Sequence, residues 1–338
     1  MSTISVIIAT FNRPVLLTEA VESVLQQSRA VHETIIVDDG SIPPVDVEGL
    51  TKRFGTKLRV IRNREPQGLA WARNQGVESA RGDYIVHLDD DDLYAPQLVE
   101  HCAAVLDEDP RTQLVFIGVE GFGSRAEHFN RAHRAGLEKV VEQARGRISE
   151  GASYRFDDSL LHGLLNQVPM SFQRVMTRRQ VWHDVTRLRY TSYGLAFGLA
   201  SEEQAKQMIR GTLRDSEWAL YAALSCRRTA LIQEPLYRQR CEGQGTSSQL
   251  AMRHTHRSQA LMIKSVLDKL VRSDAQFRAL RKPVRASLSN AYFNAAYECM
   301  TEGLYRSSLG YLWRTACLGP RLRHAKLFAR LAGGYLGG

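Results

Sequence analysis

The stretch "DYIVHLDDDDLYAP" (83–96) decides the fold, because an apolar strand pattern runs directly into four consecutive aspartates. The β-branched and apolar residues of "DYIVHL" (83–88) are typical of a strand in a buried sheet. Four adjacent carboxylates repel one another, and a bound divalent cation such as Mg²⁺ or Mn²⁺ removes that repulsion. An Asp-rich turn also caps helices, but four aspartates at the end of a strand favour the cation.

The segments around this stretch alternate between strand and helix patterns. Apolar, β-branched runs predict strands at 4–10, 58–63, 83–92 and 113–121, and a strand that ends in a turn at 33–41. Amphipathic runs between them predict helices at 14–28, 67–82 and 95–109. This order predicts an α/β fold, with a mostly parallel sheet flanked by helices.

Three polar clusters follow predicted strands of this sheet. They are Thr10-Phe11-Asn12, Asp38-Asp39-Gly40-Ser41, and the four aspartates at 89–92. Parallel strands end at the same edge of a sheet, and ligands of such sheets bind at that edge. We therefore expect the three clusters to lie together and to form a site.

The remainder of the chain has a different organisation. Residues 122–167 are polar and show little periodicity, which predicts a long mobile insertion. From about residue 250 the pattern is helical, with two helices joined near Gly303. We expect an α/β domain at 1–245 and an α-helical region at 246–338.

Composition excludes several classes of protein. Five scattered cysteines without a CxxC pair argue against a disulfide scaffold or a zinc site. No apolar run reaches the length of a membrane span, and the first residues lack the features of a signal peptide, so we expect a cytoplasmic protein. The net charge of +9 is compatible with anionic partners. Dispersed basic residues and the lack of an aromatic platform argue against nucleic acid.

Several segments together resemble the family 2 glycosyltransferases, which have the GT-A (Rossmann-like) fold. The segments are "SVIIATFNRPVLLTEAVESVLQQS", "ETIIVDDGS", "GLAWARNQGVESARGDYIVHLDDDD" and "DSEWALYAAL", within residues 3–240. The resemblance implies an inverting, Mn²⁺- or Mg²⁺-dependent transfer of a sugar from a nucleotide donor. UDP is the first expectation for the nucleotide, with dTDP and GDP as alternatives. The implied acceptor is a glycan or lipid-linked hydroxyl in bacterial-type surface polysaccharide synthesis.

The resemblance also implies roles for individual residues. Asp91 and Asp89 match the ends of the family's DxD motif and would be the metal ligands. Asp39 would hydrogen-bond the nucleobase, and Arg73 would line the nucleotide pocket. The full set of implied donor-binding residues is Thr10, Asn12, Asp39, Arg73, Asp89, Asp90 and Arg240.

The implied catalytic base is Asp215, near the start of the helix "DSEWALYAALS" (215–225). The family usually has a glutamate directly before this aspartate, but Arg214 stands there in this chain. Glu217 is therefore the alternative base. A catalytically inactive protein of the same fold that binds sugar nucleotides or glycans is the alternative function.

The C-terminal tail at 320–338 mixes Arg and Lys with Leu, Phe and Ala. Such a segment lies on an anionic membrane surface or packs as a basic helix on the fold, and the two interpretations stay open. The sequence does not indicate an oligomeric state.

Overall fold

The computed structural model describes residues 1–55, 57–144, 147–149, 153–158, 160–165, 174–209, 215–242, 250–319 and 325–329. For residues 147–149, 215–216 and 250–259 it describes the backbone alone. The chain divides into an N-terminal unit of Met1–Tyr190 and Glu203–Gly243, and a C-terminal unit of Thr191–Glu202 and Gln244–Gly338. The expected boundary of independent domains at residue 245 stays a prediction.

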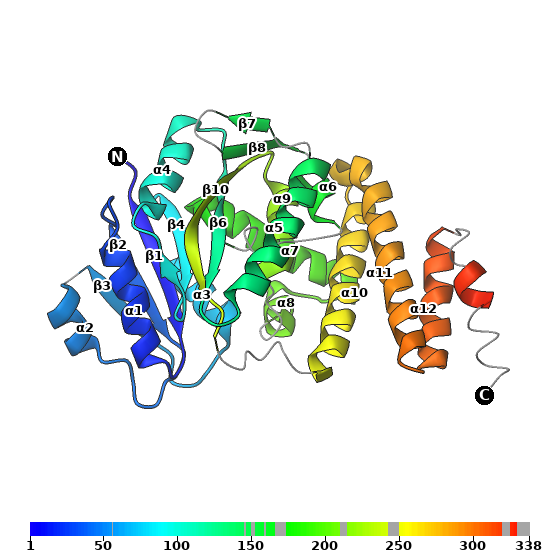
Figure 1. Cartoon of the computed structure of the whole chain (residues 1–338), viewed down its shortest axis with the longest axis horizontal. Helices are drawn as coiled ribbons and strands as arrows, with labels where there is room; N and C mark the ends of the chain where they lie inside the picture. Colours follow the sequence, from blue (N-terminus) through cyan, green and yellow to red (C-terminus); the bar gives the residue numbers. More distant parts are fainter. Residues whose placement is uncertain are drawn as a thin grey trace. The chain divides into compact units, whose positions relative to one another are not determined.

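One sheet runs through the N-terminal unit in the order β3-β2-β1-β4-β9-β6-β10-β8-β7, and β5 pairs with β10 (Figure 1). Its strands are β1 (Ile4–Thr10), β2 (Glu33–Asp38), β3 (Leu58–Arg62), β4 (Tyr84–Asp89), β5 (Leu93–Tyr94), β6 (Leu114–Phe122), β7 (Arg147–Ser149), β8 (Ser153–Asp157), β9 (Val175–Arg178) and β10 (Arg228–Arg240). Strands β3, β2, β1 and β4 are parallel neighbours, as are β6 and β10. β9 runs antiparallel between β4 and β6. The expected mostly parallel sheet is confirmed.

Helices cover both faces of this sheet. The helices that lie wholly or partly in the N-terminal unit are α1 (Pro14–Leu25), α2 (Val47–Phe54), α3 (Leu69–Ser79), α4 (Leu98–Glu108), α5 (Ala126–Gln143), α6 (Leu160–Leu164), α7 (Arg179–Phe197), α8 (Glu202–Ile209) and α9 (Asp215–Ser225). Val6 and Ile8 of β1 share a buried cluster with residues of α1 and α4. Ile7 points to the opposite face and meets α3, where a Cβ on Gly76 would lie 2.4 Å from the Ile7 side chain. The small residue lets this helix approach the sheet closely.

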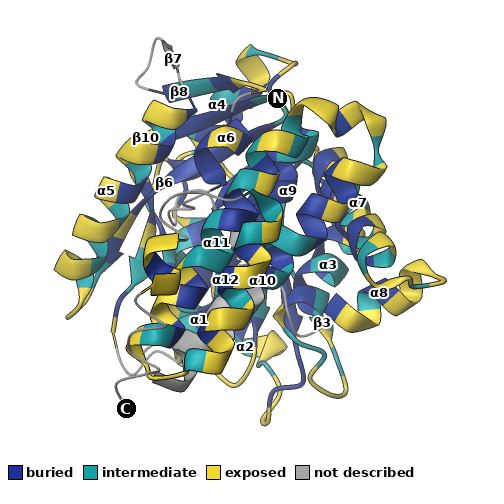
Figure 2. Cartoon of the chain, turned by 90° about the vertical axis from the view of Figure 1, so that its right-hand side faces the viewer, coloured by how far each residue is buried: buried dark blue, intermediate teal, exposed yellow. Residues whose placement is uncertain are grey.

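The range 122–167, which the sequence predicts to be a long mobile insertion, contains regular structure in its described residues. Its described residues include α5, β8 and α6. Figure 2 shows that α5 is largely exposed, and only two of its residues, Gly136 and Val140, are buried. The helix is tied to β6 by Asn130, whose side chain accepts from the Gly121 N–H at 2.7 Å and donates to its carbonyl at 3.2 Å. Its inward-facing apolar residues, such as Phe129 and Val140, are few and widely spaced, so a search for apolar periodicity misses α5. Mobility of this range stays a prediction.

The C-terminal unit is α-helical, as expected. It contains α10 (Leu250–Ser273), the 3₁₀ helix η3 (Ala275–Leu280), α11 (Arg281–Thr301) and α12 (Tyr305–Leu318). Gly303 joins α11 to α12 with a φ of 75°, which confirms the expected junction. Ala296, Leu312 and Leu327 form a small core there. Of the tail 320–338, only residues 325–329 are described, so the membrane expectation lies almost entirely outside the described residues.

Candidate active site

Three strands bring their polar ends to one edge of the sheet. Thr10 of β1 pairs in register with Asp38 of β2. The preceding residue, Ala9, pairs with Asp89 of β4. The first strand–helix turn, the Asp-Gly turn and the acidic turn therefore lie together, as the sequence predicts for a ligand site of a parallel sheet.

The four aspartates divide between a strand end and a turn. β4 ends at Asp89, and the Asp92 N–H closes the turn by donating to the Asp89 carbonyl at 3.1 Å. One carboxylate oxygen each from Asp89, Asp91 and Asp92 lies within 4.8 Å of the others. Three hard oxygen donors this close together fit Mg²⁺ or Mn²⁺. In a continuous strand, successive side chains point to opposite faces, so only Asp89 and Asp91 of these three would share a face. Asp92 joins them because alternation stops where β4 ends.

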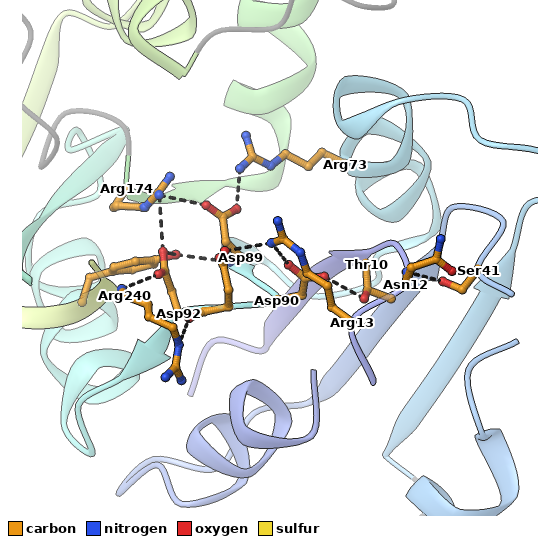
Figure 3. Close-up of polar contacts among 12 residues, drawn as sticks. Thr10, Asn12, Arg13, Ser41, Arg73, Asp89, Asp90, Asp92, Arg174 and Arg240 are labelled. Carbon is orange, nitrogen blue, oxygen red and sulfur yellow. Dashed lines mark hydrogen bonds and ion pairs between the residues drawn. The ribbon is translucent and has the colours of Figure 1, made fainter. Parts of the chain in front are cut away.

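Two buried arginines hold Asp89 (Figure 3). Arg73 of α3 donates to its carboxylate at 2.5 Å, and Arg174, which precedes β9, approaches at 2.8 Å. Both arginine side chains are only 7% exposed. Burial by itself would raise the pKa of Asp89, but the two guanidinium charges outweigh it and hold the pKa well below 3.8. Asp89 is therefore a permanent anion at the end of β4.

Asp92 is a buried acceptor of three hydrogen bonds. The Tyr237 hydroxyl donates at 3.0 Å, the Arg240 backbone N–H at 2.8 Å, and Arg174 reaches it at 3.5 Å. Burial raises the pKa of Asp92 above its ordinary value. A neighbouring divalent cation would act in the opposite direction and favour the anion. Asp92 thus links the acidic turn to the end of β10.

Arg13 lies on the solvent-exposed side of the acidic turn. It lies between β1 and α1, and its Nη1 donates to Asp91 at 2.8 Å and to Asp90 at 3.1 Å. The side chains of Arg13 and Asp91 are 50% and 36% exposed. Asp90 is buried, and its second oxygen accepts from the Thr10 hydroxyl at 2.8 Å. Asp90 therefore braces the turn, whereas Asp91 presents its carboxylate to the open side.

The other expected donor-binding residues lie around the same edge. Asp39 accepts three hydrogen bonds at 2.7–2.8 Å, from the Asn63 side chain and from the Gln67 and Gly68 N–H groups. A carboxylate has about four acceptor positions, so one remains for a ligand. Asn12, with a φ of 57°, accepts from the Ile42 N–H at 2.7 Å. The nucleotide contacts of these residues stay predictions.

Arg240 reaches the acidic turn from the end of β10. Its Nε donates to the Asp91 carbonyl at 2.9 Å, and its guanidinium pairs with Glu19 of α1. The guanidinium also lies 4.8 Å from the centre of the Phe122 ring. Its position beside the turn is compatible with donor binding, which stays a prediction.

The two candidates for the base lie at the start of α9. Asp215 is the first residue of the helix, and its side chain lies outside the described part of the chain. Glu217 is fully buried and pairs with Arg189 of α7 at 2.7 Å, with side-chain exposures of 0% and 3%. Glu217 is thus fixed in the interior by an ion pair.

Three aromatic rings near Asp89 pack in a row that the sequence does not indicate. The His87 ring lies 4.3 Å from that of Trp182, which in turn lies 4.7 Å from that of Trp218. Burial, reinforced by the charge of Arg73, lowers the pKa of His87 to about 3, so the imidazole is neutral. The stack joins β4 to α7 and α9. No local pattern reveals it, because its three members lie on three separate elements.

Sequence comparison identifies the class of protein that this chain resembles. Residues 5–165 match the model of the family described as Glycosyl transferase family 2. An uncharacterized glycosyltransferase of Haemophilus influenzae is 34% identical over 113 residues, which are 33% of this chain and 37% of that protein. The matched part spans less than half of the length of each of the most similar curated relatives.

Solved structures extend the likeness to nearly the whole chain. S. aureus TarS 1–349 in complex with UDP-GlcNAc superposes with a TM-score of 0.61 and 17% identity, over 96% of this chain and 83% of that solved chain. The mannosyltransferase PcManGT from Pyrobaculum calidifontis, in complex with GDP-Man and Mn²⁺, has a TM-score of 0.51 and 15% identity, over 99% of this chain and 81% of that protein. At these identities the likeness concerns the fold, and it confirms the expected GT-A architecture.

Proposed function

Residues 5–165 of this chain belong to glycosyl transferase family 2, and from this premise we propose that the protein is an inverting glycosyltransferase. The proposed reaction moves a sugar from a nucleoside diphosphate donor to a hydroxyl of a glycan or lipid-linked acceptor. The observation that carries the proposal is the cluster of Asp89, Asp91 and Asp92 at the ligand-binding edge of the sheet. A cluster of this kind suits a divalent cation together with a diphosphate.

In this proposal, the residues around β4 bind the metal and the nucleotide-sugar donor. We assign the metal to Asp91 and Asp89, with Asp92 as a third ligand. Mg²⁺ or Mn²⁺ held there would offset the negative charge that develops on the β-phosphate as the bond to the sugar breaks. Arg73 keeps Asp89 ionised and oriented. Asp39 retains an acceptor position for a nucleobase N–H.

In this proposal, the start of α9 supplies the base that acts on the acceptor. We assign Asp215 as the base that takes the proton from the acceptor hydroxyl, on the side of the sugar opposite the diphosphate. A single displacement of this kind inverts the anomeric carbon. The buried ion pair of Glu217 with Arg189 supports Asp215 over Glu217, because a carboxylate held in the interior has no path to an acceptor.

The nucleotide and the metal are inferred by analogy. TarS binds UDP-GlcNAc and UDP in structures that resemble this chain, which supports UDP as the first candidate. PcManGT binds GDP-Man with Mn²⁺, which supports Mn²⁺ and keeps GDP as the second candidate. In this proposal the acidic cluster would meet the diphosphate rather than the base, so it does not distinguish the two nucleotides.

We further propose that the protein works at the cytoplasmic face of a membrane in surface polysaccharide synthesis, with peripheral contact through 320–338. Residues 244–338 carry 15 lysines and arginines against four acids, whereas residues 1–243 carry 30 against 32. Such an asymmetry favours attraction of the C-terminal region to anionic lipids. In the described part of the chain, no helix combines the length and apolar character of a membrane span.

A donor screen with two variants tests the enzymatic proposal. UDP- and GDP-sugars are screened with Mn²⁺ by thermal shift, and donor hydrolysis is then measured. Asp215→Asn is expected to keep donor binding and to lose about 10²–10⁴-fold in turnover. Asp91→Asn is expected to lose the Mn²⁺-dependent part of donor binding, whereas the exposed Glu48→Gln on α2 serves as the control. Full turnover in Asp215→Asn contradicts the assigned base, and donor binding without turnover in the unmodified protein indicates the inactive binding protein.

A further inference from the structure

We propose that Arg13 is a removable counterion of the acidic turn, which couples metal binding to nucleotide binding. Without donor, Arg13 pairs with Asp91 and Asp90. When the metal–diphosphate complex enters, Arg13 leaves Asp91 to the metal and pairs with the diphosphate. The inference rests on the proposed function and gives Arg13 a positioning role in it.

The arginines around the turn differ in their freedom to move. Arg73 and Arg174 are 7% exposed and hold Asp89 from the interior. Arg13 is 50% exposed, and it contacts the turn through a single nitrogen, Nη1 (Figure 3). Its partner Asp91 is also the most exposed carboxylate of the three that lie close enough for one metal ion. An exposed ion pair is held weakly and exchanges with solvent or ligand.

The charges at the turn explain why Arg13 would leave only for a metal bound to a diphosphate. Among the described residues, four guanidinium groups approach the four aspartates, those of Arg13, Arg73, Arg174 and Arg240. A divalent cation alone would place extra positive charge among these arginines. A cation that arrives with a diphosphate adds little net charge, and the diphosphate gives Arg13 a new anionic partner.

The position of Arg13 in the fold favours the second half of this exchange. Arg13 is the N-cap residue of α1, and among the described residues no side chain caps this helix start. The positive end of this 12-residue helix therefore lies at the residue whose side chain pairs with the acidic turn. A diphosphate oxygen close to Arg13 would receive support from both the guanidinium and the helix.

The proposal has a measurable consequence in equilibrium binding. If Arg13 opposes the metal alone but supports the metal with the nucleotide, each ligand tightens the binding of the other. Removing the charge of Arg13 must then tighten Mn²⁺ binding in the absence of nucleotide and weaken it in the presence of nucleotide. A merely structural role would not move these two affinities in opposite directions.

The test measures Mn²⁺ affinity by electron paramagnetic resonance, with and without saturating UDP or GDP. In the unmodified protein we expect the nucleotide to tighten Mn²⁺ binding by about 10–100-fold, within the usual range of coupling between sites. In Arg13→Gln we expect this factor to fall about tenfold, whereas Arg13→Lys should retain it because the charge is kept. Arg53→Gln is the matched control, since Arg53 is 55% exposed and pairs with Glu22 on α1 away from the turn.

Two results would overturn the inference, and they are distinguishable. An unchanged coupling factor in folded Arg13→Gln, with Mn²⁺ and nucleotide still bound, refutes the role of Arg13 and leaves the proposed function standing. A lack of any Mn²⁺ or nucleotide binding in the unmodified protein refutes the metal-dependent donor site, and the inference falls with it. Circular dichroism of each variant establishes that it is folded.

Discussion

Glu217 provides the sharpest test of the proposal that Asp215 is the base. Its carboxylate is fully buried and lies 2.7 Å from Arg189, whose side chain is 3% exposed. The structure therefore predicts that Glu217→Ala impairs stability rather than chemistry. The truncation removes one side of a buried ion pair with Arg189, and breaking such a pair is costly.

The expected size of the effect follows from this burial. Breaking a buried ion pair by removing one partner costs about 3–5 kcal/mol. For a unit of about 150–250 residues, 1 kcal/mol lowers the melting temperature by about 2–4 °C. We therefore expect Glu217→Ala to melt roughly 6–20 °C below the unmodified protein. The double variant Glu217→Leu with Arg189→Met should recover most of this loss, because it removes both charges and keeps the volume.

The assay compares thermal unfolding by circular dichroism with turnover at a temperature where each variant is folded. Glu217→Gln keeps the shape of the side chain and should retain turnover within a few-fold once folded. Asp215→Asn should show the reverse, with an unchanged melting temperature and lost turnover. If Glu217→Gln melts normally but loses turnover by 10²-fold or more, the reasoning is wrong and Glu217 is the base.

Three further predictions concern pH, thiols and membranes. Burial would raise the pKa of Asp38, but hydrogen bonds from Ser41 and Val45 and the charge of Arg62 hold it below 3.8. Its contribution is therefore present above about pH 4 and is lost as the pH falls through the depressed pKa. In urea unfolding at pH 7, Asp38→Asn should be less stable than the unmodified protein by about 1–3 kcal/mol. On acidification the variant should lose less stability than the unmodified protein, because it lacks the carboxylate that becomes protonated. A thiol reagent should modify the exposed Cys317 in the folded protein and the other four cysteines only after unfolding. Rapid modification of a second cysteine in the folded protein would contradict the burial of Cys102, Cys226, Cys241 and Cys299. Removing residues 320–338 should reduce co-sedimentation with anionic liposomes, and equal sedimentation would exclude that contact.

The fold was largely predictable because its signals are local. Buried parallel strands read as continuous apolar runs, and β1, β2 and β4 show this pattern directly. The alternation with helices then implies the parallel order of the strands. The sequence does not reveal α5 because its inward-facing apolar residues, such as Phe129 and Val140, are few and widely spaced, and polar contacts such as those of Asn130 supplement them.

The sequence by itself determined the sheet, its carboxyl edge and the acidic turn with Asp89 and Asp91. Only the tertiary structure decided which charges meet there. Arg174 reaches Asp89 because β9 enters antiparallel between β4 and β6, and the β4–β9 pairing joins residues about 90 positions apart, such as Val86 and Met176. Likewise, only the folded structure shows that Glu217 forms a buried ion pair with Arg189, which lies on another helix. The physical reason is that strand and helix periods follow from neighbours along the chain, whereas electrostatic partners depend on distances that exist only after folding.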